Sequence, residues 1–505
     1  MNINGYKLVG YSNLIQQYNL KALPNWHSSA VSQIGAPQTT IHEDGQVESI
    51  YPMSYWPGDN LGDQLEFALK YDGINLGILS SLFEVASTVE LKNWINSKPT
   101  GKYSRKSWFL FEFLTGSELF LPDLAKGNYI ELLDSDQYFT TTPGLPSRRQ
   151  RIINNLLGVK NFCPIIRRTK ELAIMDDINL HKQYDEVTSS YSPEILSRTM
   201  KYLYTKETKS TLAIENLTAA ISRTEKFVRL LEEAGHEDFC VKDRLINLQN
   251  NIVEQRFVET DYRTIQNYVG ETFKNYREKV HYICPKPDDI QELMSGLLSA
   301  NKIMINGAVP AIVHTAAISF GFVFLHPFVD GNGRIHRLLI HNILHQRGEI
   351  PKGVMFPVSA AMLNDINRYD HSLEIFSKPL ISLIEYDIDS IGNLTVTGET
   401  ARLYKYIDMT HQTEALLHFI KRTIDSELVE ELDFLKKYDK TSEAIQNILD
   451  MPNRLIDLFI NICLDNRGHI SANKRKKLFS FLTDEEMLAM EKAFHDGFDS
   501  QNNYS

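Results

Sequence analysis

The chain has 505 residues, of which 43% are hydrophobic and 23% are charged, and such values are typical of a folded globular protein. Since one domain usually holds about 150 residues, this length predicts about three domains. The net charge of -11 argues against a nucleic-acid-binding surface over the whole chain. The four cysteines, at positions 163, 240, 284 and 463, are scattered and form no CxxC pair. Their spacing therefore indicates no thiolate zinc site, and it fits a protein of the reducing cytosol.

The beginning of the chain, MNINGYKLVGYSN, lacks the apolar core of a signal peptide. Apolar runs elsewhere are interrupted by His, Ser or Thr, so we expect no membrane span. These features predict a cytoplasmic protein.

Residues 1–185 are expected to form an accessory domain of mixed structure, with helices over Leu65–Leu82 and Val89–Trp94 and a buried aromatic segment, Trp108–Leu114. A basic cluster follows, made of Arg148, Arg149, Arg151, Arg167, Arg168 and Lys170. We favour a solvated face with ion pairs for this cluster. A binding surface for an acidic partner or nucleic acid is the alternative.

Residues 186–225 are expected to be helical. Ser192 and Pro193 are typical of a helix start, with Ser as the N-cap and Pro in the first turn. The stretch Thr211-Leu-Ala-Ile-Glu215-Asn216 follows this helix.

The most informative stretch is His326-Pro-Phe-Val-Asp-Gly-Asn-Gly-Arg-Ile-His-Arg337. An apolar, buried helix is expected over Ala311–Leu325, and Pro327 should break it. Gly331 and Gly333 let the backbone approach a ligand, and a second helix should begin at Asn332. A tight turn at a helix N-terminus presents free N–H groups, so it is a seat for a phosphate.

Side chains of this stretch fit the same chemistry. Arg334 and Arg337 are three residues apart and can reach one anion. Asp330 offers a hard oxygen ligand for Mg²⁺, and His326 can accept a proton near neutral pH.

The stretch resembles the signature of the Fic family, HPFx(D/E)GNGRxxR, and matches it at every fixed position. The resemblance covers about 190–385 and implies a mostly α fold, a Fic-type helical bundle with a small β-hairpin flap, with the catalytic domain at 226–385. It also implies an ATP-dependent protein adenylyltransferase that needs Mg²⁺. The run from Arg105 to Thr169 is similar to leader regions of some longer bacterial Fic proteins.

The resemblance assigns roles to individual residues. His326 is the base, Asp330 holds Mg²⁺, Arg334 binds the distal phosphates and Arg337 binds the γ-phosphate. The remaining nucleotide-binding positions are Phe328, Gly331, Asn332, Gly333 and, near the adenine, Tyr369. Thr211–Asn216 matches the family's inhibitory motif, (S/T)xxxE(G/N), which implies that Glu215 pairs with Arg337 and repels the γ-phosphate.

Arg263-Thr-Ile-Gln-Asn-Tyr-Val-Gly270 resembles the segment that precedes the family's flap. The flap is then expected at 271–283, including Tyr276, where it would dock a target protein by strand addition and present its hydroxyl side chain. Self-modification and a homodimer are further expectations. His341 and His345, four residues apart, could hold a metal, but a polar helix face is favoured.

Residues 386–505 are expected to form a helical tail, with helices over Thr413–Tyr438, Asn453–Leu464, Ala472–Phe481 and Asp484–Phe494. A packing module is favoured. The alternative is a helix-turn-helix or winged-helix unit that binds DNA through 472–494, where Lys474–Lys477 would contact phosphates. The alternative functions are transfer of another group, removal of AMP, and a nucleotide-gated regulator that binds DNA or protein.

Overall fold

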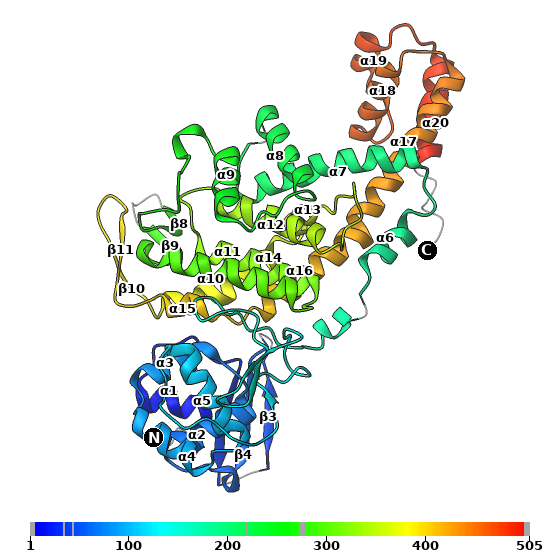
Figure 1. Ribbon diagram of the computed structural model, residues 1–505. Coiled ribbons are helices and arrows are strands. Elements are labelled where there is room, and N and C mark those ends of the chain that lie inside the picture. The colour runs from blue at the N-terminus through cyan, green and yellow to red at the C-terminus, as the bar shows by residue number, and fades with distance from the viewer. Residues whose placement is uncertain are drawn as a thin grey trace.

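The computed structural model describes residues 6–33, 36–42, 45–176, 178–218, 220–272 and 278–498. Within these residues the chain is mostly helical and its sheets are small, as expected from the sequence. Figure 1 shows an N-terminal domain, a central helical body and a C-terminal helical module that projects from it. None of the helices in the described ranges is long and apolar enough to cross a membrane.

The N-terminal domain packs helices against a four-stranded sheet of order β1-β2-β4-β3. Strands β2 and β4 are parallel, and the other pairs are antiparallel. The strands are β1 (Tyr6–Val9), β2 (His27–Ser32), β3 (Gln38–Ile41) and β4 (Val47–Pro52). The helices are α1 (Gly10–Tyr18), α2 (Leu61–Phe67), α3 (Leu76–Val85), α4 (Thr88–Ser97) and α5 (Lys102–Thr115).

The single helix expected over Leu65–Leu82 is two helices. A π-helical turn, Ala68–Asp72, ends α2, and Gly73 then has φ +86°, which breaks the helical path before α3 begins. Glycine takes the positive φ at position 73 without the steric strain of a Cβ.

The aromatic segment Trp108–Leu114 lies on α5, where Trp108 is 1% exposed, so the expected burial is confirmed.

The basic cluster of the N-terminal region is largely occupied by contacts within the protein. Arg149 pairs with Glu112 and Asp123, Arg151 donates to three backbone carbonyls, and Arg167 pairs with Asp408 at 3.0 Å. Arg149 and Arg167 thus form ion pairs of the kind that the favoured interpretation expected. The nearby sheet has the order β5-β7-β6, with β5 (Ile130–Glu131), β6 (Leu145–Ser147) and β7 (Ile152–Asn154).

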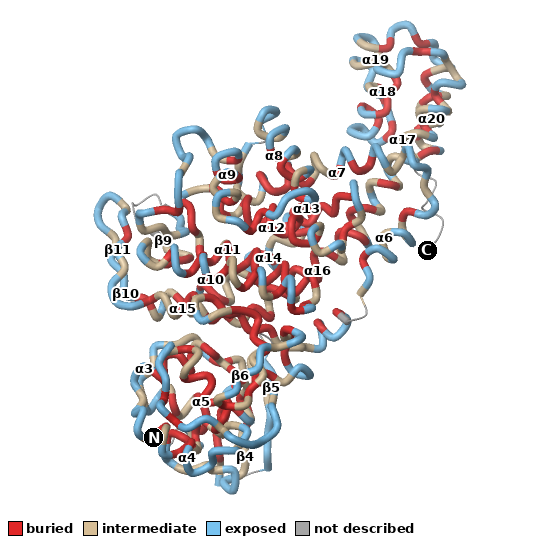
Figure 2. Tube along the Cα trace, viewed as in Figure 1, coloured by how far each residue is buried: buried red, intermediate tan, exposed pale blue. Residues whose placement is uncertain are grey.

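The central body surrounds the apolar helix α11 (Ala311–Leu325), which packs against α12 (Asn332–Gln346), α10 (Pro287–Asn306) and α16 (Thr410–Arg422). Figure 2 shows that buried residues concentrate on these helices. The same core extends to Leu432 and includes Tyr404 and Phe419. The other elements of this part are α6 (Leu180–Thr188), α7 (Pro193–Ile214), α8 (Ile221–Glu233), α9 (Lys242–Ile252), α13 (Val358–Asn364), α14 (Ile366–Ile381), α15 (Arg402–Lys405), β8 (Tyr268–Thr272), β9 (Glu278–Ile283), β10 (Glu385–Ile388) and β11 (Leu394–Thr397).

The C-terminal module has a core of its own, which runs from Ile445 to Phe494. It consists of the end of α17 (Val429–Ile448) together with α18 (Asn453–Asp465), α19 (Ala472–Leu478) and α20 (Asp484–Phe498). Among its described residues there is no strand, so the wing of a winged-helix unit is missing there. A π-helical turn, Thr423–Leu428, joins α16 to α17, so one helical rod connects this module to the central body.

Candidate functional site

His326 lies where α11 ends. Its backbone is left-handed, with φ 49°, and its N–H donates to the Phe322 carbonyl at 3.0 Å. The Nδ1 atom lies 3.1 Å from the Val323 carbonyl. A ring nitrogen that faces a carbonyl must carry the proton, so the lone pair is on Nε2. Burial lowers the pKa of His326 to about 4, which keeps this imidazole neutral at pH 7.

The loop after His326 is braced by residues outside the signature, which the sequence reasoning did not assign to the site. Arg263 is 3% exposed, and its side chain donates to the carbonyls of His326, Ile265 and Pro285. The Glu259 carboxylate accepts from the Val329 N–H at 2.9 Å. The only signal in the sequence was that Arg263 begins the segment expected before the flap. These contacts fix the backbone from which His326 projects.

Asn332 and Phe328 were expected to bind the nucleotide, but in the structure their side chains contact other parts of the protein. Both ends of the Asn332 amide bond the backbone of Phe328, at 3.0 Å to its N–H and 2.7 Å to its carbonyl. The Phe328 ring is fully buried and packs against Tyr262 and Phe322. Since these groups are already used inside the protein, they shape the loop and leave ligand contacts to the backbone and to other side chains.

The turn at the start of α12 has the expected form. Gly331 precedes the helix with φ +92°, a conformation that a residue with a Cβ adopts only with strain. Gly333 lies in the first turn, and a Cβ there would be 2.6 Å from the Glu215 Oε1 atom. The carboxylate of Glu215 therefore rests against the N-terminal turn of α12, where an anion is stabilised by the helix dipole.

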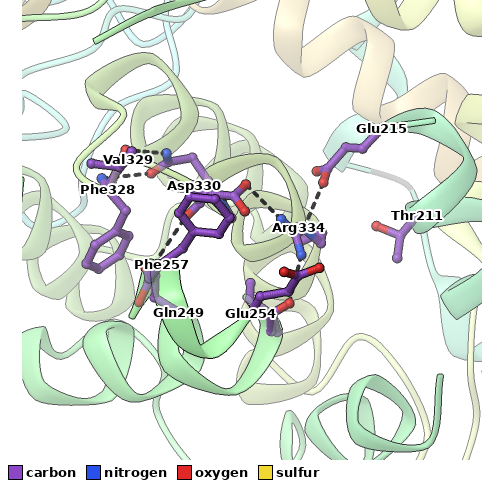
Figure 3. Close-up of polar contacts among 12 residues, drawn as sticks. Thr211, Glu215, Gln249, Glu254, Phe257, Phe328, Val329, Asp330 and Arg334 are labelled. Carbon is purple, nitrogen blue, oxygen red and sulfur yellow. Dashed lines mark hydrogen bonds and ion pairs between the residues drawn. The ribbon is translucent and has the colours of Figure 1, made fainter. Parts of the chain in front are cut away.

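Glu215 bridges both arginines of the signature. Its Oε1 atom is 2.6 Å from Arg337 Nη2, and its Oε2 atom is 2.7 Å from Arg334 Nε. Arg334 also pairs with Asp330 Oδ1 at 2.8 Å and donates to the Ile252 carbonyl at 2.7 Å. Figure 3 shows Glu215 and Asp330 approaching Arg334 from opposite sides. The predicted pair of Glu215 with Arg337 is present, and the second pair with Arg334 was not predicted.

The two flanking positions of the Thr211–Asn216 stretch have clear local tasks. The Thr211 hydroxyl accepts from Arg337 Nε, and its carbonyl accepts from Arg337 Nη2 at 3.0 Å. Glu215 caps the end of α7, and Asn216 follows with φ 54°. Because Gly and Asn tolerate the left-handed conformation best, this backbone accounts for Asn after the glutamate.

One turn earlier, α7 is fastened to the body through a buried carboxylate. Glu207 has no exposed surface, and its Oε1 lies 2.8 Å from His341 Nε2 on α12. Its Oε2 accepts from the Ser359 N–H on α13 at 2.8 Å. His341 thus belongs to a polar network, and no group of three or more metal-ligating residues occurs in the described part of the chain.

The sequence model of the Fic/DOC family matches residues 239–344, which contain α9 to α11, most of α12 and the whole stretch from His326 to Arg337. Residues 239–344 are a Fic domain. Curated relatives of this Fic domain include the protein adenylyltransferase Fic of Nematostella vectensis, 30% identical over 118 residues, or 22% of this chain and 23% of that protein. The protein adenylyltransferase Fic of Drosophila yakuba is 26% identical over 159 residues, or 31% of this chain and 28% of that protein. The match therefore spans less than a third of either relative.

Two solved structures are also similar. A Fic family protein from Desulfovibrio desulfuricans G20 aligns at 18% identity with a TM-score of 0.37, over 55% of this chain and 80% of that one. A Fic domain containing signaling protein from Bacteroides thetaiotaomicron VPI-5482 aligns at 14% identity with a TM-score of 0.34, over 52% of this chain and 94% of that one.

A hairpin covers one side of the Fic domain where the flap was expected. Strands β8 and β9 pair antiparallel, with an irregularity between Val269 and Gly270. Residues 273–277, with Tyr276 among them, lie outside the described residues. Asn267 joins this hairpin to the loop, because its Nδ2 donates to the Val329 carbonyl at 3.1 Å.

A slot of about 390 Å³ opens between the hairpin, the end of α11 and the helix α14. His326 lines it, together with the apolar side chains Val323, Phe324 and Leu373. Tyr369 does not line it: this ring is 4% exposed and packs against His336 and Phe419. The next residue, Asp370, lines the slot instead. Tyr369, which the resemblance placed near the adenine, therefore lies away from the slot, since neighbours on a helix point about 100° apart.

Asp330 fits a magnesium ion that is shared with a nucleotide. One oxygen, Oδ1, already contacts the Gly331 N–H and Arg334, and the side chain is 45% exposed. Mg²⁺ in nucleotide sites commonly takes only one or two carboxylates and completes its shell with phosphate oxygens and water. A single half-exposed carboxylate beside an anion seat matches that donor set.

Proposed function

We propose that this chain is a protein adenylyltransferase, which moves AMP from ATP to a Tyr, Ser or Thr hydroxyl of a target protein, and that Glu215 restrains it. The observation that carries the proposal is the Glu215 carboxylate, which sits on Gly333 between Arg334 and Arg337. A site that holds one anion on two arginines at a helix N-terminus, beside a neutral histidine, suits phosphate chemistry. The curated relatives of the Fic domain bear the same activity in their names.

In the proposed reaction, Nε2 of His326 takes the proton of the incoming hydroxyl. The hydroxyl oxygen forms a bond to the α-phosphorus of ATP, the bond to the bridging oxygen breaks, and pyrophosphate leaves. The N–H groups at the start of α12 and the two arginines stabilise the negative charge that develops on the phosphates. Arg263 and Asn332 hold the loop in the shape that this geometry requires.

Among the described residues, Asp330 is the one that would hold Mg²⁺ against the phosphates. When bound, Mg²⁺ neutralises phosphate charge and orients the leaving group. Arg334 shares the Asp330 carboxylate and therefore fixes the direction in which it points.

Restraint by Glu215 follows from charge and space. Arg337 is 2% exposed and its guanidinium already binds Thr211 and Glu215, so a γ-phosphate must displace the carboxylate to reach it. With the carboxylate in place, phosphate and glutamate would repel each other at the same seat. ATP would then bind with its α-phosphate misplaced for attack. Removal of AMP with the help of Glu215 is the second reaction to test.

The target is proposed to dock its backbone on the β8–β9 hairpin. This sheet has only two strands, so each strand has an edge that pairs with no other strand in the described part of the chain. Main-chain pairing there would position a hydroxyl side chain toward His326 without a demand on sequence. The protein itself is one candidate target.

The test uses ATP labelled at the α- or the γ-phosphate with four proteins: wild type, Glu215→Gly, Glu215→Gly/His326→Ala, and Glu225→Gly. Glu225 is an exposed glutamate on α8, so its variant controls for the loss of a glutamate elsewhere. We expect protein labelled from α-labelled ATP only, strongest in Glu215→Gly, absent in the double variant and at wild-type level in Glu225→Gly.

Two results would contradict the proposal in different ways. Label from the γ-position would indicate phosphoryl transfer. Equal labelling of wild type and Glu215→Gly would contradict the proposed restraint by Glu215, but the proposed transfer of AMP would stand. Loss of label from pre-labelled protein only when Glu215 is present would establish AMP removal.

A further inference from the structure

The slot beside His326 differs in charge from the anion seat. Arg334 and Arg337 lie at the seat, whereas no lysine or arginine occurs among the described residues that line the slot. Its surface is mostly apolar, and its polar residues include Glu271, Asp370 and Glu374. The phosphates of a nucleotide therefore belong at the seat, and the slot suits an uncharged, flat group. Its volume of about 390 Å³ is within the range of small-molecule pockets, about 300–1,000 Å³.

One face of α14 lines the slot with residues at helical spacing. Asp370, Leu373, Glu374 and Ser377 follow the i, i+3, i+4, i+7 pattern and share that face. Leu373 gives an apolar surface, on which a purine can pack. The carboxylates lie on either side of it in the sequence and supply hydrogen-bond acceptors.

The three carboxylates are not equivalent. Glu374 is bound to Lys378, with 2.6 Å between Oε2 and Nζ, and Glu271 lies 3.7 Å from His281. The Asp370 carboxylate has no hydrogen bond or ion pair among the described residues. Burial and the nearby Glu374 raise the pKa of Asp370 above its ordinary value. A hydrogen-bond donor on a ligand would stabilise the charged form of this group.

We propose that Asp370 reads the nucleobase by accepting a hydrogen bond from the 6-amino group of adenine, which makes it the residue that determines nucleotide specificity. This inference rests on the proposed function, because it requires a nucleotide whose phosphates lie at the seat. An ionised carboxylate only accepts hydrogen bonds, so it favours an amino group and repels a carbonyl oxygen at the same place. A nucleoside triphosphate whose purine has a 6-oxo group should therefore be a poor substrate.

The experiment compares ATP with inosine triphosphate, which has the same purine frame but a 6-oxo group in place of the 6-amino group. Both are α-labelled and are offered to the Glu215→Gly protein, so that the restraint does not obscure the comparison. We expect kcat/KM to favour ATP by roughly 10- to 100-fold, the discrimination typical of a well-matched edge contact. In Glu215→Gly/Asp370→Asn the ratio should fall to about threefold or less, because the Asn amide can donate to the 6-oxo group.

A control variant separates the contact from a general charge effect. Asp387→Asn makes the same change at an exposed aspartate of β10 that does not line the slot, and it should keep the parent ratio. The inference is overturned if Asp370→Asn keeps the parent ratio, or if the parent uses both nucleotides equally. If Asp370→Asn instead changes which target proteins are labelled, the slot holds the target side chain and not the base.

Binding measurements test the preference for ATP over inosine triphosphate independently of the transfer reaction. Calorimetric affinities of ATP and inosine triphosphate for Glu215→Gly/His326→Ala, with and without Asp370→Asn, should show the same preference and the same loss. Binding with this preference but no transfer would contradict the proposed reaction and leave the assignment of Asp370 standing. If neither nucleotide binds, both are wrong.

Discussion

Glu215 Oε1 and Arg337 Nη2 lie 2.6 Å apart, and they join the end of α7 to the first turns of α12 across 122 positions of sequence. The arginine is 2% exposed and the glutamate 23%, so the cation is buried while its partner remains reachable from solvent. A buried guanidinium needs a permanent counter-charge. The pair therefore stabilises the folded state and also provides the proposed restraint. A nucleotide that binds there must replace the carboxylate of Glu215 with its own phosphate.

The first prediction concerns Glu207, which fastens α7 to α12 and α13. Glu207→Gln would place an amide N–H against donors that now meet a carboxylate, which costs about 1–3 kcal/mol of stability. We expect a lower unfolding midpoint and, because α7 carries Glu215, more labelling from α-labelled ATP than in wild type. Thermal unfolding and the labelling assay measure both.

Glu194→Gln makes the same change in the exposed first turn of α7 and should alter both readouts far less. A destabilised Glu207→Gln protein with unchanged labelling would show that α7 can loosen without release of Glu215.

The second prediction concerns Asn216, whose φ is 54°. Asn216→Gly should keep the restraint, because glycine adopts this backbone readily. Asn216→Val should raise labelling several-fold, since a β-branched residue there costs on the order of 1–2 kcal/mol and displaces Glu215 from the seat. Labelling of the two variants side by side is the measurement, and equal labelling would speak against a role for this backbone.

The third prediction concerns the pH dependence of transfer. Since burial lowers the pKa of His326 to about 4, the neutral base is present well below the ordinary histidine value of about 6.5. In Glu215→Gly, the acid limb of the kcat/KM profile, which reports the free enzyme, should therefore lie near pH 4 to 5 and not near 6.5. A fully developed acid limb at pH 6.5 would contradict the lowered pKa of His326 in the free protein.

The fourth prediction concerns stability in acid. His314 and His336 are buried, and burial lowers the pKa of each to about 3. As the pH falls below about 6.5, these two histidines bind protons in the unfolded chain but stay neutral in the folded protein. The free energy of unfolding should then decrease steadily from pH 6.5 toward pH 3, as measured by urea unfolding at several pH values.

His314→Gln tests the origin of that slope. Glutamine can still donate to Asn301, which His314 Nε2 contacts at 2.7 Å, but it cannot take up a proton. The variant should lose less stability than wild type between pH 6.5 and pH 4.5. An unchanged slope would assign the effect to other groups.

Local sequence determined much of the central body. The apolar run Ala311–Leu325, the break at Pro327 and the helix from Asn332 all appear where the residues predicted them. The turn also follows, because only glycine adopts φ +92° without strain and only a residue without a Cβ leaves room for Glu215 at Gly333. The resemblance of short motifs to the Fic family predicted the pair of Glu215 and Arg337, which the structure contains.

Tertiary structure decided which side chains meet. The bonds from Arg263 to the His326 carbonyl and from Glu207 to His341 join residues 63 and 134 positions apart, and local periodicity carries no information about such pairs. The uses of Asn332 and of Tyr369 also depended on packing, since the same side chain can face a ligand or the core. Sequence fixes the helices and the special backbone positions because their causes are local. The slot, and the place of Asp370 in it, arise only where α11, α14 and the hairpin converge.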